Sequence, residues 1–343
     1  MNGTEDFTAI LHQLASGDRL TQEVSTRAFG ALMSGDISPV RVAALLTALA
    51  VREPSVDEIV GAVRAMRQAM RKIEAPKDAI DLCGTGGDGL GTLNISTAAS
   101  FVVAACDVPV AKHGNRNMSS RTGAADVLEA LGVRIELDPL AAERCLHEAG
   151  LCFLFAQTYH PAMKHVGSVR RELGFRTIFN LLGPLANPAN VRRQLLGVYS
   201  REWILPVANV LAKLGAEKAW VVHGSDGLDE MTTTGVTHVA VLERGKISTM
   251  TVSPQDVGLE HAILSSLKGG IPEDNADAIR RLLGGAKGPF RDIVLLNAAA
   301  ALVVADRAHD LKEGITRAAK AIDSGAAAAR LARLEQISQG VRT

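Results

Sequence analysis

The chain has 343 residues, of which 47% are apolar and 22% charged, a composition typical of a globular protein with one or two domains. Its 37 lysine and arginine residues balance 37 aspartate and glutamate residues, so bulk charge does not draw it to nucleic acid or to an anionic membrane. A site for an anion must therefore be built from a local cluster of residues.

The apolar stretches and the cysteine and histidine spacings exclude further classes. The longest apolar stretches, 98–111 and 293–305, are shorter than the roughly 20 residues of a bilayer span, and Asp107 and Asn297 interrupt them. We therefore expect core segments rather than membrane contact. The start MNGTEDFTAI lacks the pattern of a secretion signal, so we expect a cytoplasmic protein. Without C-x-x-C or H-E-x-x-H motifs, a metal here should be a hard cation held by oxygen atoms.

The N-terminal part of the chain has the pattern of a helical unit. Ser38 followed by Pro39 marks a helix start, and Ser55 with Glu58 forms a capping box in S-x-x-E spacing. In the helix that begins at Ser55, apolar residues from Ile59 to Met70 recur three or four positions apart on one face. We predict a helical domain over 1–75, with helices at 7–15, 21–32, 40–51 and from 55 to before Pro76.

From residue 79 onward, short β-like runs alternate with helical stretches, which predicts an α/β domain over 76–343 with a largely parallel sheet. Such sheets bind ligands at the carboxyl ends of their strands. Strands are expected at 79–83, 108–111, 133–137, 151–155, 194–198, 219–222 and 237–242, and helices at 96–105, 124–131, 140–149, 203–214 and 325–339.

A glycine-rich segment, GTGGDGLGTLNIST at 84–97, directly follows the first strand. Glycines let the backbone approach a phosphate closely, and a helix beginning near Ser96 would add its positive N-terminal end. Gly84, Gly86 and Gly89 match the G-x-G-x-x-G dinucleotide pattern, but the helix begins too late and Asp107 precedes the second strand instead of following it.

The same segment has no Gly-Lys-Ser/Thr, which excludes a Walker loop. Asp88 inside an anion cradle would be repulsive unless a divalent cation or a sugar hydroxyl bridges it. We therefore favour a phosphate-binding loop, while a glycine-rich connection without a ligand remains an alternative.

Two later segments follow predicted strands and carry charge. The segment at 112–123 groups cations and neutral donors that suit a phosphorylated sugar, the alternative being a solvated basic turn. In HGSDGLDE, Asp229 and Glu230 are adjacent, and on an irregular loop such a pair can share one Mg²⁺, whereas on a helix it would be ordinary surface charge. The residues of the basic segment that carry this prediction are Lys112, His113, Asn115, Arg116, Ser119, Ser120 and Arg121.

Arginines lie near apolar residues in the segment 160–188. Arg170, Arg171 and Arg176 are close in sequence to Phe175 and Phe179. An arginine beside an apolar pocket suits a ligand with a carboxylate on a hydrophobic body, because its guanidinium can pair two oxygens. Spacing alone does not choose among the three, and each on its own is more often a surface ion-pair partner.

Four motifs follow one another along the chain: GTGGD…NIST, KHGNR, RTIFNLLGPLANP and DGLDE. Together they resemble the anthranilate phosphoribosyltransferase family, over a region from about Ser38 to the C-terminus. The resemblance implies a cytoplasmic homodimer in which the helical domain, joined by part of 165–190, packs on the α/β domain. It also implies transfer of the phosphoribosyl group of phosphoribosyl pyrophosphate (PRPP) to the amine of anthranilate, with two Mg²⁺ ions and no nucleic-acid partner.

The resemblance also implies roles for individual residues. Anthranilate would contact Gly84, His113, Asn115, His160 and Arg170. The metal ligands would be Ser96, Asp229 and Glu230. No general base is implied, and Lys112 would stabilise negative charge. PRPP would contact Gly84, Gly87, Asp88, Thr92, Asn94, Ile95, Ser96, Thr97, Lys112, His113, Gly114, Asn115, Arg116, Asn117, Met118, Ser119, Ser120 and Ala124.

The chain departs from the family pattern at one position. Where members often have a serine in a segment read as GSAD, this chain has Ala124 after Gly123. One hydroxyl contact to PRPP is therefore replaced, with a modest expected effect on affinity. Two alternatives remain: a pyrimidine nucleoside phosphorylase, and a non-enzymatic relative that binds nucleic acid, for which the neutral charge is unfavourable.

Overall fold

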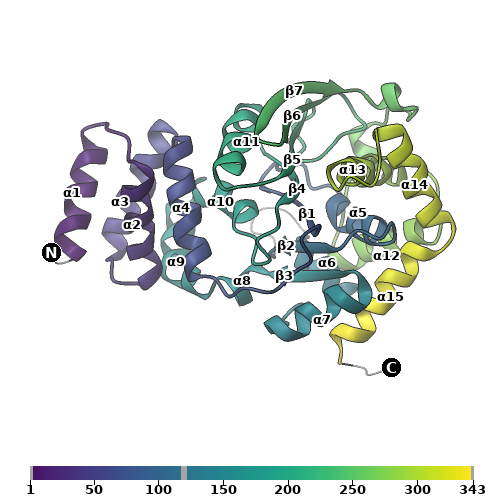
Figure 1. The fold of residues 1–343 in the computed structure, drawn as a ribbon, viewed down its shortest axis with the longest axis horizontal. Helices are drawn as coiled ribbons and strands as arrows, with labels where there is room; N and C mark the ends of the chain where they lie inside the picture. Colours follow the sequence, from purple (N-terminus) through teal and green to yellow (C-terminus); the bar gives the residue numbers. More distant parts are fainter. Residues whose placement is uncertain (1–2, 117–121, 341–343) are drawn as a thin grey trace.

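The computed structural model describes residues 3–116 and 122–340. Its N-terminal helices form a lobe at one end of the molecule (Figure 1). Ser55 caps the last of them as the sequence predicts: its hydroxyl accepts from the Glu58 N–H at 3.3 Å, and its own N–H donates to the Glu58 carboxylate at 2.7 Å. The helices are α1 (Gly3–Ala15), α2 (Gln22–Ser34), α3 (Pro39–Arg52) and α4 (Val56–Ala69).

Two later helices pack against this lobe. The helix α9 (Lys164–Leu173) contacts α2 and α3, and α10 (Phe179–Leu185) contacts α4. Their apolar residues, Val166 and Val169 in α9 and Leu182 in α10, are buried in one core with the N-terminal helices. The lobe is therefore built from two parts of the chain that are far apart in sequence.

The larger lobe contains one sheet with strand order β3-β2-β1-β4-β5-β6-β7. The first five strands in this order are parallel, whereas β6 pairs antiparallel with β5 and β7 antiparallel with β6. The predicted mostly parallel α/β fold beside a helical lobe is confirmed. The strands are β1 (Ile80–Gly84), β2 (Val110–Gly114), β3 (Leu151–Phe155), β4 (Arg193–Gly197), β5 (Lys218–Gly224), β6 (Thr237–Glu243) and β7 (Lys246–Val252).

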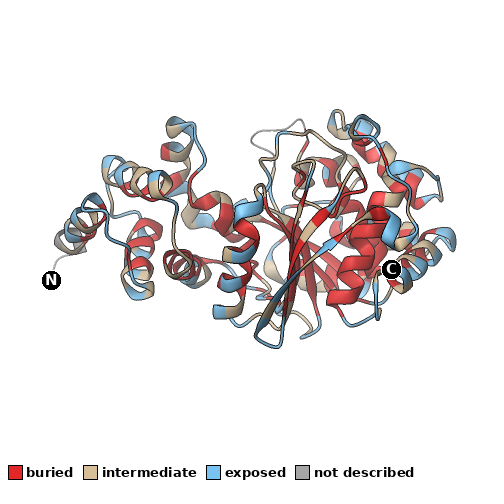
Figure 2. Ribbon diagram, turned by 90° about the horizontal axis from the view of Figure 1, so that it is seen from above, coloured by how far each residue is buried: buried red, intermediate tan, exposed pale blue. Residues whose placement is uncertain are grey.

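Helices cover both faces of the buried sheet (Figure 2). Along β4, Leu195 lies in one core and Leu196 in the other, because successive side chains of a strand point to opposite faces. The core that contains Leu196 also contains the apolar residues of the helical lobe, so the two lobes share it. The remaining helices are α5 (Ile95–Ala104), α6 (Ala124–Ala130), α7 (Pro139–Ala149), α8 (Ala156–Tyr159), α11 (Ile204–Lys213), α12 (Pro272–Leu283), α13 (Pro289–Val304), α14 (Leu311–Asp323) and α15 (Ala326–Ser338), with short 3-10 turns at Pro161–Met163, Arg201–Trp203, Pro254–Val257 and Leu264–Leu267.

The strand predicted at 133–137 is wrong. Val133, Ile135 and Leu137 are buried and the residues between them are exposed, so the alternation is real. The segment pairs with no strand, however, and the Arg134 N–H donates to the hydroxyl of Ser338 in α15 at 3.1 Å. Alternating apolar and polar residues indicate an extended chain with one side buried, but not what buries it. Here the buried side lies against helices, not beside another strand.

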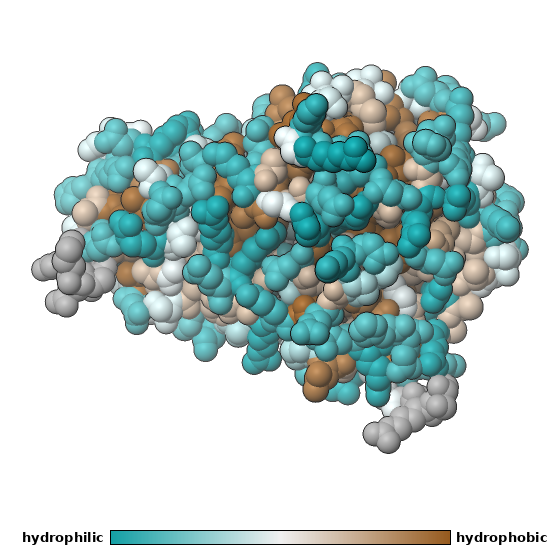
Figure 3. Space-filling view, viewed as in Figure 1, coloured by the Kyte–Doolittle hydropathy of each residue, from teal (hydrophilic) through white to brown (hydrophobic). Residues whose placement is uncertain are grey.

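The two long apolar stretches are core segments, as predicted. They lie in and after α5 and in α13, and nearly all of their residues are buried. In the part of the chain that the structure describes, none of the helices combines the length and the apolar character that a membrane crossing requires. On the face drawn in Figure 3, hydrophilic residues predominate and apolar residues lie in scattered patches.

Candidate active site

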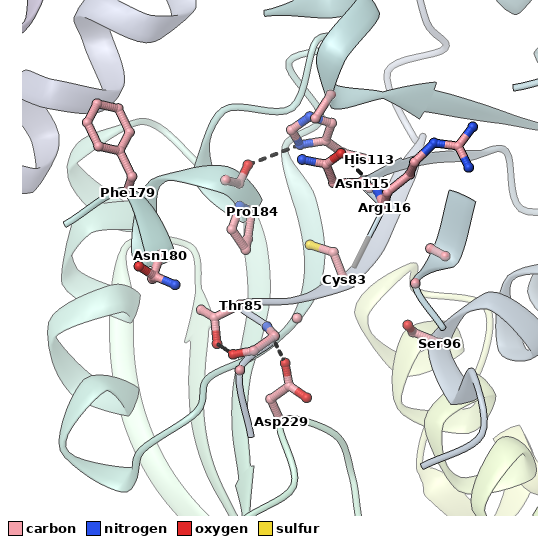
Figure 4. Close-up of a pocket in the computed structure, with 18 of the residues that line it drawn as sticks. Cys83, Thr85, Ser96, His113, Asn115, Arg116, Phe179, Asn180, Pro184 and Asp229 are labelled. Carbon is pink, nitrogen blue, oxygen red and sulfur yellow. Dashed lines mark hydrogen bonds between the residues drawn. The ribbon is translucent and has the colours of Figure 1, made fainter. Parts of the chain in front are cut away.

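A cavity of about 960 Å³ lies between the carboxyl ends of the central strands and the helices α9 and α10. Figure 4 shows part of its lining, with Asp229 on one side of the loop after β1 and Phe179 and Asn180 of α10 on the other. The cavity brings together every predicted site residue that the structure describes. These are Gly84, Gly87, Asp88, Thr92, Asn94, Ile95, Ser96, Thr97, Lys112, His113, Gly114, Asn115, Arg116, Ala124, His160, Arg170, Asp229 and Glu230.

The loop between β1 and α5 has a backbone that requires glycine. Gly86, Gly87, Gly89 and Gly91 have φ angles of 67°, 78°, 72° and 61°, in the left-handed region that other residues rarely adopt. The loop leads to the N-terminus of α5, where Ser96 lies in the first turn. Backbone N–H groups of a helix start suit an anion, as the sequence predicts for this segment.

Two carboxylates hold this loop from the other side. The Asp229 carboxylate accepts from the Gly86 N–H at 2.7 Å (Figure 4). The Glu230 carboxylate accepts from the Ser96 N–H at 3.1 Å. Their segment lies so close to the sheet that a Cβ at Gly84 would lie 2.2 Å from the Asp229 carboxylate. A Cβ at Gly197 would lie 1.6 Å from the Asp229 carbonyl oxygen, so both positions require glycine.

Burial and mutual repulsion make this carboxylate pair unusual. Burial, with the charge of Asp88 as the next cause, raises the pKa of Asp229 to about 6. Burial, and then the charge of Asp229, raises the pKa of Glu230 to about 8. Burial likewise raises the pKa of the Asp88 carboxyl. Groups shifted in this way gain by binding a cation, which favours their charged forms.

Oxygen donors for a hard cation are present, but the protein does not complete a cage. Among residues 3–116 and 122–340, no cluster of three or more histidine, cysteine, aspartate or glutamate side chains could hold a metal. Asp229, Glu230 and the Ser96 hydroxyl fit a cation such as Mg²⁺, which keeps several waters and takes ligand phosphates. Lys112 lies beside them, since its Nζ donates to the Leu82 carbonyl and lies 3.3 Å from the Ser96 Oγ.

The basic segment after β2 is only partly described. Arg116 forms ion pairs with Asp126 at 2.9 Å and with Glu129, which raise the pKa of its guanidinium. Asn115 accepts from the Arg116 N–H at 2.8 Å. The predicted contacts Asn117, Met118, Ser119 and Ser120, together with Arg121, lie outside the described residues.

Two buried histidines lie close together in the cavity lining, and one of them contacts α10. His113 and His160 lie with ring centroids 5.1 Å apart, and the His113 Nδ1 lies 3.0 Å from the Gly183 carbonyl oxygen. Burial lowers the pKa of His113 to about 3 and that of His160 to about 4, so both rings are neutral. The Nε2 atoms of both rings are buried without a hydrogen-bond partner.

The structure separates the three arginines that the sequence left open. Arg170 and Arg171 line the cavity, whereas Arg176 does not. The guanidinium of Arg170 lies 5.2 Å from the ring centroid of Phe179, and burial lowers its pKa. An arginine against an aromatic ring in a cavity suits a ligand with a carboxylate on a flat apolar body.

Two family models match the chain: "Glycosyl transferase family, a/b domain" over residues 76–328 and "Glycosyl transferase family, helical bundle domain" over 8–70. The anthranilate phosphoribosyltransferase of Rhodopseudomonas palustris strain TIE-1 is 57% identical over 333 residues, which is 97% of this chain and 98% of the relative. The chain belongs to the anthranilate phosphoribosyltransferase family.

Solved structures of family members share the fold. The enzyme from Thermus thermophilus has a TM-score of 0.91 and 46% identity over 96% of this chain and 99% of its own. The enzyme from Saccharomyces cerevisiae in complex with PRPP and Mg has a TM-score of 0.90 and 28% identity over 97% and 98%. In complex with 4-fluoroanthranilate it has a TM-score of 0.89 and 27% identity, with 99% of both chains covered. The nucleoside phosphorylase alternative is therefore not favoured.

Sequence reasoning missed part of this family member's cavity. Met66 of α4, Met163, Asn180 of α10 and Pro184 line it, and each comes from the helical lobe or the segments that join it. No local pattern distinguishes such residues, because only the packing of α4, α9 and α10 brings them to the sheet edge. Asn180 and Pro184 lie in the motif RTIFNLLGPLANP, whose spacing alone assigns neither of them a contact.

A buried polar network under the cavity was also missed. Asp81 of β1 is fully buried and accepts from the Asn187 side-chain amide at 2.8 Å and from the His113 N–H at 3.2 Å. Asn187 also donates to the Ala111 carbonyl at 2.8 Å. The network fixes the end of RTIFNLLGPLANP to β1 and to β2, the strand that carries Lys112. The available signal was a charged residue, Asp81, inside the strand predicted at 79–83.

Proposed function

We propose that this cavity transfers the 5-phosphoribosyl group of PRPP to the amine of anthranilate, giving N-(5-phosphoribosyl)anthranilate and pyrophosphate. The observation that carries the proposal is the buried pair Asp229 and Glu230, held against the glycine-rich loop by the Gly86 and Ser96 N–H groups. The pair faces a cavity whose opposite wall carries Arg170 over an aromatic ring. One wall suits a magnesium pyrophosphate and the other an aromatic carboxylate.

The PRPP molecule would lie along the glycine-rich loop and the end of β2. Left-handed glycines leave the loop backbone open to close approach by phosphate oxygens. Lys112, fixed between the Leu82 carbonyl and the Ser96 hydroxyl, would place its positive charge beside the leaving pyrophosphate. The other proposed contacts are Gly84, Gly87, Asp88, Thr92, Asn94, Ile95, Thr97, His113, Gly114, Asn115, Arg116, Asn117, Met118, Ser119, Ser120 and Ala124.

We propose Mg²⁺ as the cation, in two ions, one bound by Ser96 and the other by Asp229 and Glu230. The relative from Saccharomyces cerevisiae has been solved with PRPP and Mg, and the oxygen donors of this chain fit the same ion. When bound, Mg²⁺ neutralises charge that develops on the pyrophosphate as its bond to the ribose breaks. The protein's own part is to hold the donors together in a buried site.

Anthranilate would bind between α9 and the loop after β2. Arg170 would pair its carboxylate, and Gly84, Asn115 and the two neutral histidines would contact its body and amine. The aryl amine of anthranilate is neutral near pH 7 and can attack without a strong general base. Catalysis would therefore come mainly from positioning and charge stabilisation.

The domain limits and the assembly are also proposals. We propose a helical domain over 1–75 joined by part of 165–190, an α/β domain over 76–343, and a homodimer in the cytoplasm. Val40 and Val51 of α3 are 80% and 82% exposed, which supports a partner surface on the helical lobe. The four cysteines are free thiols, as is usual in a reducing compartment.

The decisive experiment follows the loss of anthranilate fluorescence when the purified protein is mixed with PRPP and Mg²⁺. Fluorescence should fall only when all three are present, with one pyrophosphate released for each anthranilate consumed. Omission of PRPP, of Mg²⁺ or of protein provides the controls. A protein that leaves anthranilate unchanged but cleaves thymidine or uridine with inorganic phosphate would overturn the proposal in favour of a phosphorylase.

A further inference from the structure

One polar residue lies within the apolar helix α13. From Ile293 to Val304 every residue of this helix is buried, and Asn297 is the one that is not apolar. Asn297 has no exposed surface. A buried amide is costly unless its donors and acceptor are bonded, so its partners indicate why it stands there.

The partners of Asn297 lie in the loop that carries the carboxylate pair. Its side-chain oxygen accepts from the Met231 N–H at 3.0 Å, and its side-chain amide donates to the Met231 carbonyl at 2.8 Å. The same amide donates to the Ile293 carbonyl in its own helix at 2.9 Å. Asn297 therefore bonds both the N–H and the carbonyl of Met231, the residue directly after Glu230.

Further hydrogen bonds within the loop, from Asp226 to the start of β6, also stabilise its conformation. Asp226 accepts from the Leu228 N–H at 3.2 Å and from the Thr232 hydroxyl at 2.6 Å, and the Thr232 N–H donates to the Thr237 hydroxyl at 2.9 Å. These bonds lie within the loop and its own strand β6. Asn297 joins the backbone of this loop to a core helix.

We propose that Asn297 is a positioning residue that fixes the backbone after Glu230 so that Asp229 and Glu230 present their oxygens together to the metal-bound pyrophosphate. This inference rests on the proposed function and deepens it. It identifies a residue that contacts neither substrate nor metal but sets the geometry of those that do.

The physical need for such a residue follows from charge. Two adjacent carboxylates repel each other, and a free loop would relieve the repulsion by turning one of them away. The bonds to Gly86 and Ser96 hold the carboxylates at one side, and the bidentate bond from Asn297 holds the peptide at the other. Residues behind metal ligands typically change metal affinity about 10–100-fold when they are replaced.

The test measures binding of magnesium pyrophosphate by isothermal titration calorimetry. Asn297→Leu keeps the branched shape of the side chain and removes both bonds to Met231, and we expect the affinity to fall about 10–100-fold. The Mg²⁺ concentration for half-maximal turnover should rise in parallel, while the anthranilate KM stays unchanged. Asn297→Ser is a second variant, since its hydroxyl can bond the Ile293 carbonyl of its own helix and so leaves no unpaired side-chain group at position 297.

The matched control is Leu302→Ala, on the same helix and equally buried. Leu302 lies five positions along the helix from Asn297 and so on a different face. The cavity should lower the Tm, but the variant should bind magnesium pyrophosphate as the wild type does. If the Asn297 variants also bind as the wild type does, the inference is overturned. If the wild-type protein itself binds no magnesium pyrophosphate and consumes no anthranilate, the proposed function fails instead, and the two outcomes are distinct.

Discussion

The guanidinium of Arg176 lies over the ring of Tyr199, with its central carbon 4.5 Å from the ring centroid. The same guanidinium donates to the carbonyl of Gly87 in the glycine-rich loop. Arg176 belongs to the segment between α9 and α10, whereas Tyr199 follows β4. The pair therefore ties the helices that line one wall of the cavity to the loop that forms the other.

Replacing Arg176 should loosen the glycine-rich loop. An exposed cation over an aromatic ring contributes about 0.5–1 kcal/mol, so Arg176→Leu should raise the PRPP KM about two- to fivefold. The anthranilate KM should change less. Steady-state kinetics with each substrate varied in turn measures both, and Tyr199→Phe, which keeps the ring, is the control. An equal rise in both KM values would mean that Arg176 supports the fold as a whole.

The carboxylate pair should set the magnesium requirement. Asp229→Asn and Glu230→Gln keep the shapes of the side chains but remove the charges that attract a cation. We expect turnover at fixed Mg²⁺ to fall and the half-saturating Mg²⁺ concentration to rise about tenfold or more. Turnover is measured as a function of Mg²⁺ concentration, with Asp18→Asn, an exposed carboxylate of the helical lobe, as the control. An unchanged Mg²⁺ dependence would remove the pair from the metal site.

Arg170 should act on one substrate. A charged hydrogen bond contributes about 1.5–3 kcal/mol, so Arg170→Ala should raise the anthranilate KM about 10–100-fold with little change in the PRPP KM. Arg64→Ala, at an exposed position of α4 that does not line the cavity, provides the control. An effect confined to the PRPP KM would contradict a carboxylate-binding role.

The sequence predicted the parts of this molecule that depend on local chemistry. The capping box of Ser55 and Glu58 and the glycine-rich loop are each specified by residues a few positions apart, and both were predicted correctly as elements. The strand expected at 133–137 failed because buried alternation does not reveal whether a neighbouring strand is present. The edge strand β7 was missed because its largely exposed residues give no such alternation.

Long-range relationships were beyond the sequence. Asn297 looked like an interruption of an apolar run, and only the fold places it against Met231, 66 positions away. Arg170, Arg171 and Arg176 were equivalent by spacing and differ only in what α10 and β4 bring beside them. The contacts of the cavity wall with α4 likewise depend on how two lobes share one core.

The buried histidines should make the fold sensitive to acid. Burial lowers the pKa values of His113 and His160 to about 3 and about 4, from the ordinary value of 6.5. At a pH between the lowered pKa of the folded protein and 6.5, the unfolded chain binds protons that the folded chain does not. The free energy of unfolding that depends on the neutral histidines is therefore fully present above pH 6.5 and falls as the pH decreases. Each histidine should remove about 1.4 kcal/mol per pH unit below 6.5.

Thermal unfolding followed between pH 7.5 and 5 tests this dependence. In His160→Gln the decrease of Tm with falling pH should be shallower than in the wild type. His147→Gln, at an exposed position of α7, is the control and should leave the slope unchanged. Equal slopes in all three proteins would mean that other groups control the acid sensitivity.

Gly197 should be required for the position of Asp229 and Glu230, because it leaves room for their backbone beside β4. It lies beside Gly84 in the register of β1 and β4, and an added Cβ would lie 1.6 Å from the Asp229 carbonyl oxygen, which is backbone and cannot turn away. Gly197→Ala must therefore displace the Asp229 segment, at a cost of about 1–3 kcal/mol or more. We expect a lower Tm together with a raised Mg²⁺ requirement.

Gly30→Ala is the control, on the exposed face of α2 where a Cβ meets nothing within 4 Å. It should leave the Mg²⁺ requirement unchanged and raise the Tm, because alanine has the better helix propensity. A Gly197→Ala protein with wild-type Mg²⁺ dependence would show that the segment can shift without moving its carboxylates.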